Sequence, residues 1–148
     1  MIVVERLQSL VTWLSQSATS HLIQSRIFAS QRLNKLAEKY AAHAAEEQNY
    51  IVKFIDRIIA LGGDVKNEDK MAELIYKDAV EYLNYDLQVS KDSLEWLAEL
   101  IADVQEDSIT FQLLSDYYQE EKSKMLWTEQ QLEMIEMIGR QNWLDKQL

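Results

Sequence analysis

The chain has 148 residues, of which 47% are hydrophobic and 27% charged, so we expect one globular domain over residues 1–148 and exclude a disordered protein. The formal net charge of −10 disfavours binding to nucleic acid and favours binding of cations. The lack of cysteine excludes disulfides and thiolate chemistry. No apolar run approaches the ~18 residues of a membrane span, and the first residues do not form a signal peptide, so we expect a cytoplasmic protein that does not contact a membrane.

Two long helices are predicted in the first half of the chain. Proline is absent and there are only three glycines, so little interrupts helical structure. Apolar residues recur at spacings of three and four, which predicts one helix over about 3–30 and a second over about 33–61. Ser30 and Gln31 form the link, and Gly62 with Gly63 should end the second helix. Such a short link predicts an antiparallel hairpin.

The second half of the chain repeats this arrangement. A third helix is predicted over about 70–105. Asp107 or Ser108 should cap a fourth helix that continues to about residue 137. A short helix over about 141–147 should follow Gly139. The third and fourth helices are therefore also expected to form a hairpin.

The connection between the two hairpins is much longer than the links within them. Residues 62 to about 72 could span roughly 35 Å if extended, which is about the length of one helix. Such a connection could cross from one end of the molecule to the other. We therefore predict an all-α fold, a four-helix bundle with one long crossover and a short C-terminal helix.

Three segments carry a resemblance to a known family. They are residues 57–63 (Arg-Ile-Ile-Ala-Leu-Gly-Gly), Glu121 with Trp127 and Glu129, and residues 137–144 (Met-Ile-Gly-Arg-Gln-Asn-Trp-Leu). Together they resemble the bacterioferritin branch of the ferritin family. The Ala-Leu-Gly-Gly ending and Gln119-Glu-Glu-Lys are equally similar to Dps-type mini-ferritins. The resemblance implies a ferritin-like bundle that binds or stores iron and assembles into a homo-oligomeric cage built from dimers, of either 12 or 24 subunits.

The family's diiron centre matches this chain in part. On each of two helices the family has a Glu-x-x-His motif, in which residues i and i+3 share a face and bind one metal. The resemblance places Glu47 and Glu121 on the two bridging glutamates. The two histidines fall on Tyr50 and Lys124, neither of which is an imidazole ligand.

The other family ligands are also replaced. The terminal carboxylates fall near residues 14–17 and 88–92, where Asp92 is the only acidic residue. The methionine that ligates haem between bacterioferritin subunits falls on Gln48, so haem binding is not supported. Ferroxidase activity therefore follows from the family resemblance alone.

Lys124 would place a positive charge where the resemblance expects a metal. One hypothesis is that Lys124 replaces the charge of the metal and pairs with Glu47 and Glu121, while Tyr50 donates a further hydrogen bond. The alternatives are a diiron centre that survives these replacements and a Lys124 side chain that reaches solvent.

The two histidines have different surroundings in the sequence. His43 lies one turn before Glu47, so the two could bind one metal from a single helix face, although a lone histidine among alanines is more often a packing or surface residue. His21 has no carboxylate three or four residues away, which favours a packing or surface role more strongly.

The predicted function is that of a ferritin-like cage subunit that binds or stores iron, with its ferroxidase centre altered or lost. The candidate metal ligands are Glu47, Glu121, Asp92 and His43. Acidic runs elsewhere are usually solvated faces or helix caps, but in a cage they could also attract ferrous ions. The alternative is a non-catalytic structural or interaction subunit that assembles with itself or with a partner ferritin-like chain.

Overall fold

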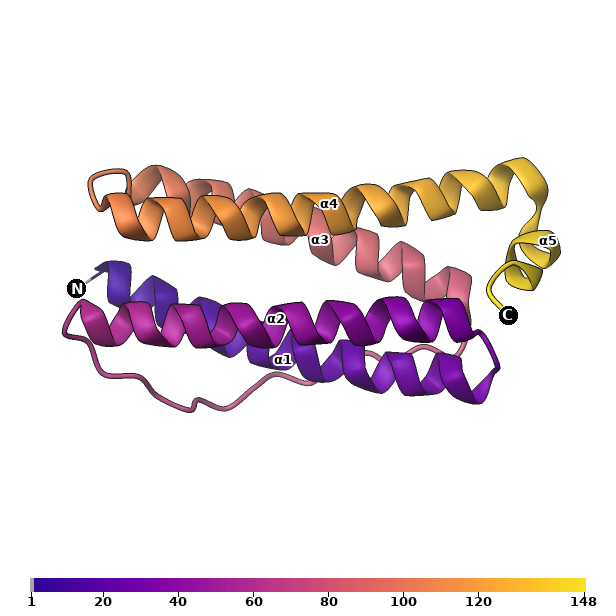
Figure 1. Cartoon of the computed structure of the whole chain (residues 1–148), viewed down its shortest axis with the longest axis horizontal. Coiled ribbons are helices and arrows are strands. Elements are labelled where there is room, and N and C mark those ends of the chain that lie inside the picture. The colour runs from indigo at the N-terminus through magenta and orange to yellow at the C-terminus, as the bar shows by residue number, and fades with distance from the viewer. Residues whose placement is uncertain (1) are drawn as a thin grey trace. The chain divides into compact units, whose positions relative to one another are not determined.

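The computed structural model describes residues 2–148, which form helices and no strand (Figure 1). The helices are α1 (Ile2–Ser30), α2 (Asn34–Ala60), α3 (Ala79–Asp103), α4 (Ser108–Ile138) and α5 (Arg140–Asp145). The predicted all-α class with four long helices and a short C-terminal helix is confirmed. None of the helices within residues 2–148 combines the length and the apolar character needed to cross a membrane.

The chain divides into two compact units, each built on one helical hairpin. The first unit contains the residues up to Lys77 together with Gln147 and Leu148, and the second contains Asp78–Lys146. In the first unit α1 and α2 pack along each other as an antiparallel pair (Figure 1). In the second unit α3 packs on α4, and α5 follows α4. Both short links thus produce the hairpins that the sequence predicted.

No side chain caps the start of α2. The N-cap residue is Leu33, whose side chain has no atom that can accept a hydrogen bond from the first turn. The backbone N–H of Lys35 donates to the carbonyl oxygen of Gln147 at 2.9 Å. One of the amide groups that every helix start leaves open is therefore satisfied by a residue from near the other end of the chain.

α2 ends at the predicted glycine pair. The N–H of Gly62 donates to the carbonyl of Ile59, and the N–H of Gly63 donates to the carbonyl of Ile58, both at 3.0 Å. These two bonds form a Schellman motif, which requires a left-handed residue just beyond the helix. Gly62 supplies it with φ +82°.

Replacing Gly62 by alanine should lower the free energy of unfolding by about 1 kcal/mol, because a Cβ atom disfavours the left-handed backbone. Urea denaturation at one fixed protein concentration measures the change. Gly62→Asn is the matched variant, and its effect should be smaller because asparagine tolerates this conformation. Equal losses in the two variants would contradict a conformational cause.

α3 begins at Ala79, later than the predicted start near residue 70. The preceding residues are extended and lie beside α1, which they follow from near its start toward its end (Figure 1). The amide of Gln8 binds the backbone of Lys66, and the amide of Gln24 binds the backbone of Tyr76. These bonds satisfy backbone groups that helix formation would otherwise use. Because they reach from near the start of α1 to near its end, the long crossover is confirmed.

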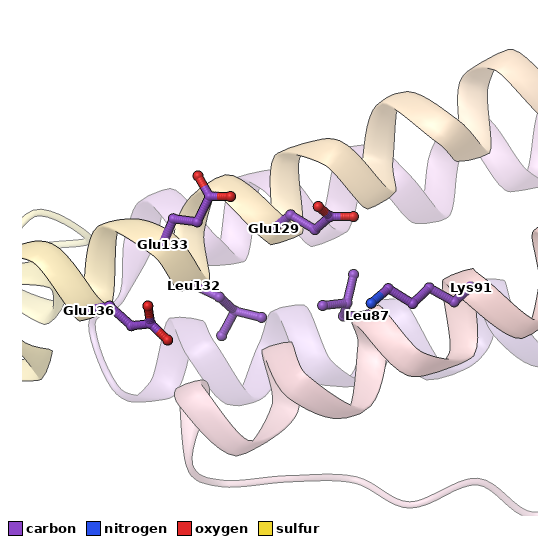
Figure 2. Close-up of a pocket in the computed structure, with 6 residues that line it drawn as sticks. All are labelled: Leu87, Lys91, Glu129, Leu132, Glu133 and Glu136. Carbon is purple, nitrogen blue, oxygen red and sulfur yellow. The ribbon is translucent and has the colours of Figure 1, made fainter.

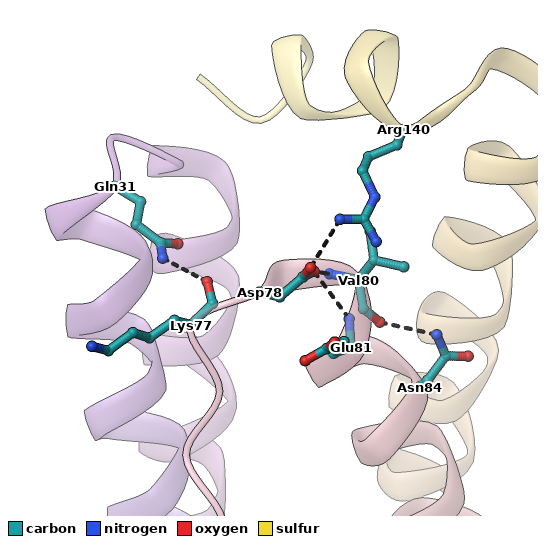
Figure 3. A network of polar contacts seen from close by, with 7 residues as sticks. All are labelled: Gln31, Lys77, Asp78, Val80, Glu81, Asn84 and Arg140. Atoms are coloured by element: carbon teal, nitrogen blue, oxygen red, sulfur yellow. Dashed lines mark hydrogen bonds and ion pairs between the residues drawn. The ribbon is translucent and has the colours of Figure 1, made fainter.

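Asp78 caps the start of α3 and also binds α5. Its Oδ1 accepts the N–H groups of Val80 and Glu81 at 2.9 and 3.3 Å, and its Oδ2 accepts Nη1 of Arg140 at 2.8 Å (Figure 3). Partial burial raises the pKa of Asp78. The hydrogen bond from Arg140, the two N–H groups and the charge of Arg140 together outweigh that effect, so the pKa lies below its ordinary value of 3.8.

Stability should therefore depend on the charge of Asp78 in a defined pH range. A lowered folded pKa means that the contribution is complete above the ordinary value of 3.8 and is lost as the pH falls through the folded value. At pH 7, Asp78→Asn should cost less than about 1 kcal/mol, since the side chains of Asp78 and Arg140 are 33% and 54% exposed. Thermal unfolding should show this difference shrinking as the pH falls below 3.8.

α4 and α5 are held by two further contacts. Of the two predicted caps for α4 the structure uses Asp107, whose carboxylate accepts the N–H of Thr110 at 3.2 Å and its hydroxyl at 2.6 Å. On α5 the side chain of Trp143 is fully buried, and its indole Nε1 donates to Oε1 of Gln131 on α4 at 2.9 Å. A buried tryptophan with its one donor satisfied anchors the short helix to α4.

Candidate functional site

A buried polar contact joins α1 and α2 in the first unit. Glu47 of α2 is 1% exposed, and its Oε1 contacts Nδ1 of His21 of α1. A carboxylate buried to this degree needs a polar or charged partner, and the imidazole of His21 supplies one. This contact across the hairpin was not predicted, because His21 has no carboxylate three or four residues away on its own helix.

His43 lies in the same cluster. Its ring is buried on α2, with its centroid 5.0 Å from that of Tyr40 and 5.9 Å from that of His21. The centroids of His21 and Tyr40 are 5.5 Å apart. These edge-to-face and tilted arrangements are typical of packed aromatic groups. The first unit thus packs two imidazoles against a buried tyrosine, and one of them also contacts the carboxylate of Glu47.

In the second unit the other bridging-position glutamate has a basic neighbour. Nζ of Lys124 lies 3.7 Å from Oε1 of Glu121, one turn earlier on α4. Both side chains are buried, with Lys124 at 9% exposure, so the alternative in which Lys124 reaches solvent is wrong. The predicted pairing of Lys124 with Glu121 is observed, whereas the contact observed for Glu47 within its unit is His21.

Two acidic residues of α3 differ in burial. Asp92 is exposed and accepts a hydrogen bond from Nε2 of Gln88 at 3.0 Å. Asp86 is buried and was not predicted as a site residue. Its signal was the spacing, because Asp86 continues the buried stripe of α3 three residues after Leu83 and four before Ser90.

The family resemblance also led to predictions for Tyr50 and Gln48. The ring of Tyr50 packs on Phe54, with centroids 5.9 Å apart, and Nζ of Lys53 lies 4.9 Å from the centroid of the Tyr50 ring. These are the contacts of an aromatic packing residue. Gln48, at the haem-ligand position, is exposed on α2. An amide has no soft donor atom for haem iron, so the expectation on haem stands as a prediction.

A groove of about 210 Å³ lies between α3 and α4 in the second unit (Figure 2). Its lining consists of two leucines, one lysine and three glutamates: Leu87, Lys91, Glu129, Leu132, Glu133 and Glu136. The glutamates project from α4 at helical spacing around an apolar floor. Across the residues that the structure describes, no three histidine, aspartate or glutamate side chains converge closely enough to hold a metal ion.

The all-α fold is that of one protein family. A family model described as "Ferritin-like domain" matches residues 4–138, and the chain belongs to this ferritin family. A protein named bacterial ferritin from Neisseria meningitidis serogroup B is 31% identical over 150 residues, which cover 99% of this chain and 96% of that protein. A bacterial ferritin from Synechocystis is 29% identical over 136 residues, 86% of this chain and 84% of that protein. The predicted ferritin-like resemblance is confirmed.

Proposed function

We propose that this chain is a subunit of an iron-storing cage whose intrasubunit ferroxidase centre is altered or lost. Membership of the ferritin family and the name of its relatives, bacterial ferritin, support iron storage. In this proposal residues 1–148 act as a single ferritin-like domain in which both hairpins take part. The subunits assemble as a homo-oligomer built from dimers in the cytoplasm, with iron ions as the cargo.

The observation that carries the altered centre is the local pairing of both glutamates. Each glutamate at a bridging position has a basic side chain of its own hairpin beside it, His21 for Glu47 and Lys124 for Glu121. A metal ion binds carboxylates that can turn their charge toward it, and it is repelled by an ammonium group at the same place. Iron at either position would have to compete with these partners.

The candidate ligands do not contribute equally to the proposal. Glu47 and His43 are buried near each other on α2 and could offer iron a mixed carboxylate and imidazole site. Glu121 would bind iron only after separation from Lys124. Asp92 is exposed on α3, so it would bind iron at a solvated position. Each of these weakened ligand environments favours slow uptake over rapid oxidation.

Mass photometry followed by iron loading tests the proposal. The purified chain should form a large shell, and addition of Fe²⁺ in air should give a slow rise of ferric absorbance without a rapid stoichiometric phase. A monomer or dimer that takes up no iron would contradict storage. A rapid phase that Glu47→Gln abolishes would contradict the altered centre, and a full-sized shell without iron would instead favour the structural subunit.

A further inference from the structure

The groove between α3 and α4 has an apolar floor and a charged rim (Figure 2). Leu87 of α3 and Leu132 of α4 form the floor, and both side chains are only partly exposed. Glu129, Glu133 and Glu136 project from α4 along one side of the groove. At about 210 Å³ the groove is smaller than the roughly 300–1,000 Å³ of sites for drug-sized molecules, so its size suits a small ligand.

The rim carries more negative than positive charge. Lys91 of α3 supplies one positive charge against the three glutamates, which gives the lining a net charge of −2. In the part of the chain that the structure describes, none of these four charged side chains forms an ion pair or a hydrogen bond. The carboxylates of the rim are therefore available to a cation from outside the chain.

The spacing of the glutamates distinguishes between two kinds of cation. Glu129, Glu133 and Glu136 share one face of α4, where they follow each other at about 6 and 4.5 Å along the axis. Calcium and magnesium ions hold their oxygen ligands at about 2.0–2.6 Å, and no three histidine, aspartate or glutamate side chains of residues 2–148 converge to hold a metal ion. A linear cation whose charges are separated by short methylene chains can instead reach one carboxylate after another.

We propose that this groove binds a linear aliphatic polyamine. Its ammonium groups pair with Glu133 and Glu136, which lie at the end of the groove away from Lys91 (Figure 2). Its methylene chain lies on Leu87 and Leu132, where it is removed from water. Such a ligand uses both the charge and the apolar floor, whereas an inorganic cation uses the charge alone. The proposal goes beyond iron storage and does not rest on it.

Calorimetric titration of the purified chain, in the oligomeric state that it adopts, tests the proposal with spermidine, a linear triamine. Binding should saturate at one spermidine per chain. The compact ion hexaamminecobalt(III) carries the same charge but has no methylene chain, so it should bind several-fold more weakly. Spermidine binding that does not saturate, or equal binding of the two cations, would overturn the proposal.

Two double variants locate the bound polyamine. Glu133→Gln combined with Glu136→Gln should weaken spermidine binding about tenfold, because two charge-assisted contacts are lost. The matched control is Asp116→Asn combined with Glu120→Gln, which removes the same charge from two exposed positions elsewhere on α4. Equal weakening by the two double variants would overturn the proposal, since it would report only the net charge of the chain.

A further substitution tests the apolar floor. Leu132→Ser keeps every charge of the groove but removes apolar surface under the methylene chain, so spermidine should bind several-fold more weakly. Leu126→Ser makes the same change on α4 at a position that is 46% exposed, and it should leave binding unchanged. Unchanged binding in Leu132→Ser would overturn the proposal. If this variant loses helix content by circular dichroism, the comparison with hexaamminecobalt(III) tests the floor on the unaltered chain.

Discussion

Replacing His21 by leucine should lower the free energy of unfolding by about 3 kcal/mol. Leucine fills most of the space of the imidazole, so the loss comes from Glu47, whose carboxylate is 1% exposed and would remain in the core without the imidazole beside it. Removal of one hydrogen-bond partner from a buried polar group typically costs about 1–3 kcal/mol, and more when the remaining group is charged. Chemical denaturation measures the loss, at a fixed protein concentration because assembly contributes to stability.

A double-mutant cycle assigns this loss to the pair. Glu47→Gln removes the charge that needs the imidazole, so adding it to His21→Leu should recover part of the lost stability. Leu22→Ala, at an exposed neighbouring position of α1, is the control and should change stability by less than about 0.5 kcal/mol. Additive effects of His21→Leu and Glu47→Gln would show that the two side chains do not depend on each other.

Replacing Lys124 by glutamine should tighten the binding of ferrous iron by roughly tenfold or more. The ammonium lies 3.7 Å from Oε1 of Glu121, and two unit charges about 4 Å apart interact by about 4 kcal/mol at an effective dielectric constant of 20. Glutamine keeps the length and polarity of the side chain but removes the positive charge that repels the metal. Anaerobic calorimetric titration with Fe²⁺ measures the change.

Lys122→Gln is the matched control for Lys124. It changes the net charge of the chain by the same amount and lies two residues earlier on the same helix. A general electrostatic effect on iron affinity would appear equally in both variants. Tightening in Lys124→Gln alone would locate the effect at Glu121, and equal binding by the two variants would contradict a role for Lys124 in excluding metal.

The helices could be predicted from the sequence because their signals are local. Gly62 and Gly63 end α2, Asp107 caps α4, and the spacing of apolar residues repeats along each helix. The start of α3 was misplaced because residues 70–78 contain good helix formers such as methionine, alanine and glutamate. Their extended form depends on Gln8 and Gln24, and nothing in local sequence identifies partners so far away in the chain.

In the candidate site, too, contacts within one helix could be predicted from the sequence and contacts between helices could not. The contact between Glu121 and Lys124 follows from their spacing on one helix, so it could be predicted. The contact between His21 and Glu47 joins two helices and depends on the rotation of each about its own axis. Spacing within a helix does not contain that rotation. The buried position of Asp86, by contrast, continues the spacing of the buried residues on α3 and could have been predicted.

The bond from the N–H of Lys35 to the carbonyl of Gln147 has a consequence for the order of folding during synthesis. The α1–α2 hairpin leaves the ribosome long before Gln147 is made, and domains begin to fold from the N-terminal side as they emerge. The first turn of α2 must therefore wait, with this amide hydrated, until Gln147 has been synthesised. A change that displaces the backbone at Gln147 would disturb the start of a helix made much earlier in synthesis.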